Sequence, residues 1–123
     1  MLSIRALIHD SRWRLHWRLL ALACVVIVAW FAFMPSDEVP ELTGVDKVNH
    51  MLAFVALAFT VRQAGLTWMR AALALLAYGV LIEVVQSFLP TRHGDIADLV
   101  ADLVGIAAGL LCVTLTRRLV RVR

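Results

Sequence analysis

The sequence is poor in cysteine and lacks the common motifs of soluble catalytic sites. Its two cysteines, Cys24 and Cys112, each lie inside an apolar run and show no CxxC spacing. This arrangement gives no support for a disulfide framework or a cysteine-based zinc site. P-loop, HExxH, nucleophile-elbow and dinucleotide-binding motifs are absent from the sequence as well. The enzyme classes built on those motifs are therefore excluded.

Charged residues are also scarce, at 17% of the 123 residues, whereas hydrophobic residues make up 62%. The mean hydropathy is +0.84. A soluble domain is about half apolar, and a chain this short would leave much of its apolar surface in water. The composition therefore argues against an ordinary soluble domain and makes the lipid bilayer the expected partner.

Four apolar segments approach the length of about 20 residues that a helix needs to cross a bilayer. We expect helices at about 15–34, 45–62, 68–89 and 95–116. The second segment is purely apolar only over 51–61, which is too short to cross alone. Its polar first turn must therefore lie in or near one leaflet.

No internal repeat or composition break divides the chain. We therefore expect a single domain over residues 1–123, an all-α polytopic membrane protein with four transmembrane helices in an antiparallel bundle. Hydrophobicity continues past Cys24 to Met34, which favours an uncleaved first helix over a lipoprotein signal.

Most arginines lie at one end of these segments. They flank the first segment, the connection between the second and third, and the end of the fourth: Arg5, Arg12, Arg14, Arg18, Arg62, Arg70, Arg117, Arg118, Arg121 and Arg123. Because short basic loops stay in the cytoplasm during insertion, this pattern predicts an N-in/C-in topology with the acidic connections outside. Arginines that flank apolar spans suit anionic lipid headgroups, so no nucleic-acid partner is expected.

The polar residues of three segments fall at one depth. With a helical rise of about 1.5 Å per residue, His50 lies roughly 18 Å from Arg62, Glu83 roughly 20 Å from Arg70, and Asp102 roughly 22 Å from Arg117. Helical spacing also places the members of each group on one face: Asp46 with His50, Glu83 with Gln86, and Asp95 with Asp98 and Asp102. We expect one outward-facing pocket of acidic, histidine and arginine side chains within the membrane.

Two glycines continue the acidic face of the fourth segment. Gly105 and Gly109, with Ala101, form a small-xxx-small ridge. Such ridges allow close helix contact in membranes, so we expect these two glycines to be packing residues. The acidic end of the same face should then point into the bundle.

Carboxylates in the membrane need compensation, because each lipid-exposed one costs at least about 2.5–3.5 kcal/mol. Lys47 and Arg92 are the cations of this region, and they leave its acidic residues in excess. The excess could attract a divalent cation, and Asp98 with Asp102 are the candidate metal ligands. The identity of any cofactor stays open.

Two motifs in the same region resemble the VanZ-like family of membrane proteins. The first is Asp46-Lys47-Val48-Asn49-His50 followed by Phe54, which is similar to the family pattern D-K-x-x-H-x-x-x-F. The second is a series of polar, proline and glycine positions: Glu83, Gln86, Pro90, Arg92, Asp95, Asp98 and Gly105. The family usually has Asn where this chain has Asp102, so the chain carries an additional carboxylate there.

The resemblance implies a small bacterial protein of the cytoplasmic (inner) membrane with a role in the cell envelope. The namesake of the family is associated with resistance to the glycopeptide teicoplanin. Our first hypothesis is a non-transporting envelope factor whose pocket binds a headgroup, a lipid-linked envelope precursor or a glycopeptide. Its polar ligand-binding or structural residues are Lys47, Gln86, Arg92 and Asp95.

Two other hypotheses remain open at this stage. In an intramembrane enzyme acting on a lipid-linked or phosphate-bearing envelope substrate, Asp46, His50 and Glu83 are the candidate catalytic residues, with acid–base roles. The third hypothesis is an ion or proton pathway through the acidic band. The oligomeric state does not follow from the sequence.

Several of the same residues have simpler interpretations. Asp95 is expected to cap the fourth helix, with Asp98 completing a capping box. Gln86 is expected to form a hydrogen bond between helices. Lys47 and Arg92 could serve only to neutralise the acids, Arg92 through a buried ion pair that fixes the helix register.

Overall fold

The computed structural model describes residues 3–39 and 46–122, and all its regular elements are helical. The order is α1 (Ile4–His9), the 3₁₀ turn η1 (Ser11–Trp13), α2 (Arg14–Phe33), α3 (Asp46–Gln63), α4 (Trp68–Phe88) and α5 (Ile96–Val122). Within those two described ranges there is no β-strand, which confirms the all-α prediction. The expected start of the second helix at residue 45 lies outside the described residues.

Three stretches of helix are long and apolar enough to cross a membrane, and α3 is not among them. They are Ser11–Phe33, Trp68–Phe88 and Ile96–Arg121. The prediction of four such helices is thus supported for three. The shortfall in α3 has a simple cause, because its 18 residues begin with Asp46 and Lys47 and its apolar part is short.

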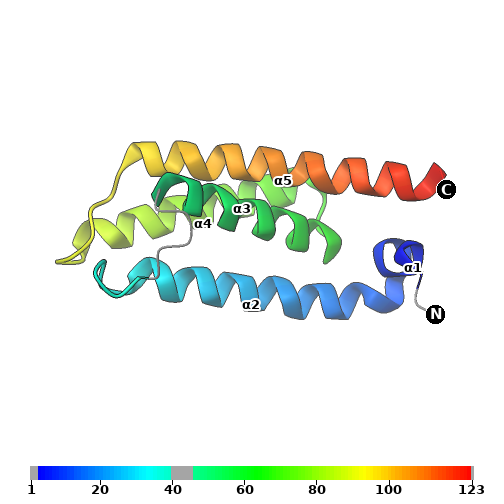
Figure 1. Ribbon diagram of the computed structural model, residues 1–123, viewed down its shortest axis with the longest axis horizontal. Coiled ribbons are helices and arrows are strands. Elements are labelled where there is room, and N and C mark those ends of the chain that lie inside the picture. Colours follow the sequence, from blue (N-terminus) through cyan, green and yellow to red (C-terminus); the bar gives the residue numbers. More distant parts are fainter. Residues whose placement is uncertain (1–2, 40–45, 123) are drawn as a thin grey trace.

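The four long helices run side by side, and α3 lies between the others (Figure 1). It contacts α2, α4 and α5, and the most extensive of these contacts is with α5. Phe54, Leu57 and Ala58 of α3 are at most 1% exposed. They pack in one core with Leu75 of α4 and Leu110 of α5, among others. The helix with the least membrane-like sequence is therefore the one most enclosed by protein.

Large apolar side chains cover much of the outer surface of the bundle. On α2 the exposed ones are Leu15, Leu19, Leu20, Leu22, Val26, Ile27, Trp30, Phe31 and Phe33. An apolar surface of this extent is unusual for a soluble monomer and matches a hydrocarbon environment.

Gly105 and Gly109 lie where α5 approaches α3 most closely. A Cβ atom on Gly105 would overlap the backbone oxygen of Met51. A Cβ on Gly109 would lie 2.6 Å from the backbone oxygen of Val55 and 2.7 Å from the Cβ of Ala58. The two positions thus accept no side chain while the helices stay at this separation.

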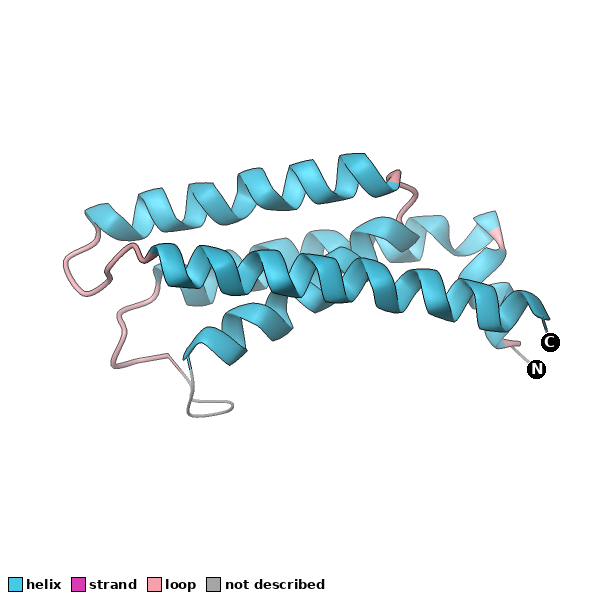
Figure 2. Cartoon of the chain, turned by 90° about the horizontal axis from the view of Figure 1, so that it is seen from above, coloured by secondary structure: helices cyan, strands magenta, loops and turns pink. Residues whose placement is uncertain are grey.

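The helix ends sort into two groups (Figures 1 and 2). α1, the turn between α3 and α4, and the C-terminal part of α5 lie at one end. Thr67 caps α4 there by accepting a hydrogen bond from the Arg70 backbone N–H, and Gly65 supplies a left-handed turn with φ of +111°. Arg117 Nε donates to Gln63 Oε1 at 2.7 Å and ties α5 to α3 at this basic end. The opposite end carries most of the acidic residues.

α5 continues to Val122, beyond the expected end near residue 116. Arginine is a good helix former, so Arg117, Arg118 and Arg121 extend the helix past its apolar part.

Candidate functional site

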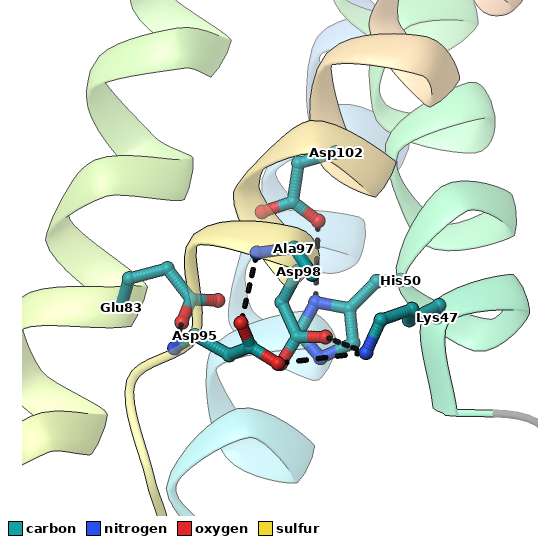
Figure 3. Close-up of polar contacts among 7 residues, drawn as sticks. All are labelled: Lys47, His50, Glu83, Asp95, Ala97, Asp98 and Asp102. Atoms are coloured by element: carbon teal, nitrogen blue, oxygen red, sulfur yellow. Dashed lines mark hydrogen bonds and ion pairs between the residues drawn. The ribbon is translucent and has the colours of Figure 1, made fainter.

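The polar residues gather at the end of the bundle opposite α1, where the first turn of α3, the last turns of α4 and the start of α5 meet (Figure 3). The chain turns here because Pro90 cannot continue α4. Asp95 then caps the start of α5. Three helices thereby present polar side chains to one volume.

Asp95 lies immediately before α5 and accepts a hydrogen bond from the Ala97 backbone N–H at 2.9 Å through Oδ1. This bond lowers the pKa of Asp95 from its ordinary value, and the nearby Lys47 acts in the same direction. The backbone N–H of Asp95 donates to Glu83 Oε2 at 2.9 Å. A carboxylate from α4 thus occupies the position that a capping box would give to Asp98.

Lys47 spans two acidic residues at the surface of the site. Its Nζ lies 3.5 Å from Asp95 Oδ2 and 3.5 Å from Asp98 Oδ1. The Asp98 side chain is 10% exposed, whereas those of Lys47 and Asp95 are about half exposed. Lys47 therefore links the start of α3 to the start of α5 and compensates part of the acidic charge.

His50 and Asp102 form the most enclosed polar pair. His50 Nδ1 lies 3.2 Å from Asp102 Oδ1, and the two side chains are 15% and 1% exposed. When Nδ1 carries the proton, it donates to the ionised carboxylate and fixes the orientation of the ring. Oδ2 of Asp102 has no hydrogen-bond partner among the residues that the structure describes.

Glu83 completes this group from α4. The residue is 9% exposed, and its Oε1 has no hydrogen-bond partner within the described part of the chain. Ligand atoms of His50, Glu83 and Asp102 all lie within 4.8 Å of one another. A second group with the same spacing consists of Asp46, His50 and Asp98. The expected metal pair, Asp98 and Asp102, is therefore divided between two groups that share His50.

Arg92 donates to backbone oxygens of α2, whereas the sequence suggested that it pairs with the acidic side chains. Its Nε donates to the Met34 backbone oxygen at 2.9 Å and its Nη2 donates to the Phe31 oxygen at 2.7 Å. Both acceptors lie at the C-terminal end of α2, where carbonyl groups have no partner within the helix and the helix dipole favours a cation. Arg92 thus holds α2 against the site.

Two side chains of α4 also hold α2 through its backbone oxygens. Gln86 Nε2 donates to the Ala32 oxygen at 2.9 Å, the bond between helices that its sequence position suggested. Tyr78 Oη donates to the Val25 oxygen at 2.6 Å. Our sequence analysis did not single out Tyr78, although it is the only tyrosine in the chain. Its hydroxyl group inside an apolar helix could have indicated a hydrogen bond to a neighbouring helix.

Two adjoining cavities open from the site. The first has a volume of about 260 Å³ and is lined mainly by apolar side chains of α2, α3 and α4, including Val28, Ala53 and Ile82. The second has a volume of about 380 Å³ and is lined mainly by polar residues, including Lys47, His93 and Asp98. Four residues line both cavities: Asp46, His50, Gln86 and Arg92.

Comparison with known proteins gives one finding. The model of the VanZ/LLP1 family matches residues 4–117, which include all the candidate site residues. No curated protein and no solved structure matches the chain. The match extends the resemblance seen in the motifs between Asp46 and Gly109 to nearly the whole sequence, and this membrane protein therefore belongs to the VanZ/LLP1 family.

Proposed function

We propose that this protein binds an amphipathic molecule of the bacterial cell envelope at the outer face of the cytoplasmic membrane. The polar headgroup would occupy the polar cavity and the apolar part would occupy the cavity between α2, α3 and α4. The ligand class comprises lipid-linked envelope precursors, other lipid headgroups and glycopeptides. The whole chain would act as one domain in this role.

The observation that carries the proposal is that the two cavities adjoin one another. A mainly apolar cavity and a mainly polar one share Asp46, His50, Gln86 and Arg92 as their common wall. Ligand sites are typically concave and mostly apolar, with a few polar groups that fix orientation. A ligand that matches both cavities must have an apolar part joined to a polar one.

The charges of the polar cavity suit a headgroup with its own charge or many hydroxyl groups. Lys47 and His93 contribute positive or neutral donors, and Asp95 and Asp98 contribute acceptors. Arg92, whose Nε and Nη2 donate to backbone oxygens of α2, also lines this cavity. Arginine and lysine are common partners of phosphate and carboxylate groups.

We further propose that α3 crosses the membrane as the fourth helix of an N-in/C-in bundle. Its core position means that α2, α4 and α5, rather than lipid, surround much of it. Its polar first turn meets Asp95 and Asp98 instead of acyl chains. The grouping of arginines at the opposite end supports a cytoplasmic location for that end.

Cysteine labelling in intact spheroplasts tests this topology. In a chain with Cys24→Ala and Cys112→Ala, a single cysteine is placed by Asp37→Cys or by Arg118→Cys. A membrane-impermeant maleimide should label the first variant without permeabilisation and the second only after it. Labelling of Arg118→Cys in intact cells would contradict the proposed orientation.

Filling the apolar cavity tests the binding proposal. Ala53 lines that cavity, whereas Leu52, one residue earlier, is 48% exposed on the outer surface of the bundle. Purified full chain is titrated with a polyprenyl phosphate and, separately, with teicoplanin, while the polyprenol without phosphate serves as the headgroup control. Ala53→Trp should weaken binding at least about tenfold because the cavity is small, and Leu52→Trp should leave it unchanged.

Two results would contradict the binding proposal. One is a failure of the wild-type chain to bind either probe. The other is equal affinity of the Ala53→Trp and Leu52→Trp variants, which would place the ligand outside the cavity. Equal affinity for the phosphate and the polyprenol would remove the role of the polar cavity.

A second candidate function, an intramembrane enzyme, is favoured by the His50–Asp102 pair. A carboxylate within 3.2 Å of one imidazole nitrogen can orient the ring so that the other nitrogen acts as a general base. Asp46 and Glu83 are the further acid–base candidates of this hypothesis. Mass spectrometry of a polyprenyl-phosphate substrate incubated with the purified chain tests it, since a change in mass lost in His50→Gln would support catalysis. Unchanged substrate would count against it.

The ion or proton pathway stays a prediction. Proteoliposomes containing the full chain should show a cation-dependent current if the acidic band conducts. The absence of such a current would rule out this alternative.

A further inference from the structure

Three separate helices bring His50, Glu83 and Asp102 to one point. They belong to α3, α4 and α5, and their candidate ligand atoms all lie within 4.8 Å of one another. In Figure 3 the Glu83 carboxylate comes from the left, the Asp102 carboxylate from above and the His50 ring from the right. Atoms so close together share a single small volume.

Two carboxylate oxygens in this volume have no partner among the described residues. They are Glu83 Oε1 and Asp102 Oδ2, on residues that are 9% and 0% exposed. Leaving a charged oxygen buried without a partner costs more free energy than leaving a neutral one so. The arrangement therefore lacks a positive charge at a defined place.

The nearby cations are committed to other acceptors. Lys47 bridges Asp95 and Asp98, and Arg92 donates to backbone oxygens of α2. His50 has one polar contact with Asp102, and candidate ligand atoms of Glu83, Asp46 and Asp98 also lie within 4.8 Å of its ring. A protonated imidazole would balance only one of the two negative charges of Glu83 and Asp102.

We propose that His50, Glu83 and Asp102 bind a divalent transition-metal ion. One imidazole nitrogen and two carboxylate oxygens suit Zn²⁺, Mn²⁺, Fe²⁺ or Co²⁺, whereas Mg²⁺ and Ca²⁺ prefer oxygen ligands alone and Cu⁺ prefers sulfur. The ion would supply the missing positive charge and neutralise both carboxylates.

The distances are compatible with such an ion. Ligand atoms about 2.1 Å from a metal lie about 3.0–3.4 Å from one another in octahedral or tetrahedral geometry. His50 Nδ1 and Asp102 Oδ1 are already 3.2 Å apart. Glu83 has three rotatable side-chain bonds, and its oxygen needs to move at most about 1.8 Å from the 4.8 Å limit to complete the set.

The other triad is a weaker alternative. Asp46 is exposed, and the Oδ1 of Asp98 already faces Lys47 Nζ at 3.5 Å. A metal there would compete with a positive charge that is already in place. The two triads share His50, so a variant of Asp98 separates them.

Asp102 offers a substitution that changes charge and little else. An amide is a weaker metal ligand than a carboxylate. Asp102→Asn therefore removes the additional charge with almost no change in side-chain volume. The inference stands independently of the envelope ligand, because it requires only metal binding to the isolated protein.

Titration with Co²⁺ tests the proposal. The full chain is purified in detergent, stripped of metal with a chelator, and titrated while the visible absorption of bound Co²⁺ is recorded; Zn²⁺ is then added as a competitor. The wild-type chain should bind one ion per chain, without the thiolate absorption that Cys24 or Cys112 would produce. Asp102→Asn and Glu83→Gln should each weaken binding at least about tenfold, since even indirect partners of a metal contribute 10–100-fold.

Asp98→Asn is the matched control and should bind Co²⁺ within about twofold of the wild type. Failure of the wild-type chain to bind, unchanged binding by Asp102→Asn, or a loss in Asp98→Asn as large as in Asp102→Asn would each overturn the proposal. Helical circular dichroism and a single elution peak establish that each variant is folded.

Pulsed electron paramagnetic resonance of the wild-type chain loaded with Mn²⁺ gives an independent reading if a carboxylate variant does not fold. It should detect coupling to a histidine nitrogen, and His50→Gln should abolish that coupling. A spectrum without nitrogen coupling in the wild type would overturn the assignment of His50.

Discussion

Gly109→Ala should destabilise the protein, although alanine favours helix more than glycine does. The new Cβ would lie 2.6 Å from the Val55 backbone oxygen and 2.7 Å from the Ala58 Cβ. Both atoms belong to α3, and neither can rotate away as the end of a flexible side chain can. The clash is relieved only when α3 and α5 move apart.

The magnitude follows from two opposing effects. Ordinary van der Waals contact of these atoms begins near 3.4 Å, so the helices must separate by about 0.8 Å at this point. Overpacking of this kind costs about 1–3 kcal/mol, and the backbone contact places Gly109 in the upper half of that range. The gain in helix propensity offsets about 1 kcal/mol. We expect a net loss of about 1–2 kcal/mol in the free energy of unfolding.

Equilibrium unfolding of the detergent-solubilised chain, followed by circular dichroism, measures this loss. Ala107→Val is the matched control, because Ala107 lies on the same helix and is exposed. Its effect should stay within about 0.5 kcal/mol. A Gly109→Ala variant as stable as the wild type would refute the reasoning, since it would show that α3 and α5 can part without cost.

Three further perturbations address the polar contacts. Arg92→Gln should lower the free energy of unfolding by about 1–3 kcal/mol, because it removes charged donors from the C-terminal carbonyls of α2. Equilibrium unfolding of the variant measures this loss, and an unchanged free energy would contradict that role of Arg92. Tyr78→Phe should lower the free energy of unfolding by about 1 kcal/mol, because it removes the hydrogen bond to the Val25 oxygen. The same assay measures this, and an unchanged free energy would show that the bond does not stabilise the fold. Asp95 has a lowered pKa in the folded state, so its contribution to stability is present above the ordinary value of 3.8 and is lost as the pH falls below it. Asp95→Asn should therefore lose less stability than the wild type between pH 5 and pH 3, and equal losses would count against the cap.

The sequence predicted the long apolar helices from local signals. The helix expected at 68–89 is found as Trp68–Phe88, and Pro90 lies two residues beyond its end. Such signals act within one or two turns, because caps and proline affect only the neighbouring backbone groups. The acidic end of the bundle could likewise be predicted from helical rise and spacing alone.

The role of α3 was not predictable in the same way. Its sequence is the least apolar of the four long helices, and the structure encloses it between α2, α4 and α5. Burial of Leu57 and Ala58 depends on which neighbouring helices cover them, and the hydropathy of one segment does not indicate those neighbours.

The partners of individual polar groups likewise depend on how the helices pack. Counting charges suggested that Arg92 neutralises acids and that Asp98 and Asp102 act together. In the structure Arg92 bonds to carbonyls of α2, while Asp98 meets Lys47 and Asp102 meets His50. Backbone carbonyls are present at every residue, so the sequence cannot indicate which of them a helix end leaves available.

The sequence by itself determined that this protein is helical, apolar and polarised, with arginines at one end and carboxylates at the other, because these properties depend on local composition and on the period of one helix. The tertiary structure decided which carboxylates share a volume, which cation each one receives and which helix lies at the centre. Those outcomes depend on the packing of separate helices, where a rotation of one helix about its axis exchanges the partner of every side chain it carries.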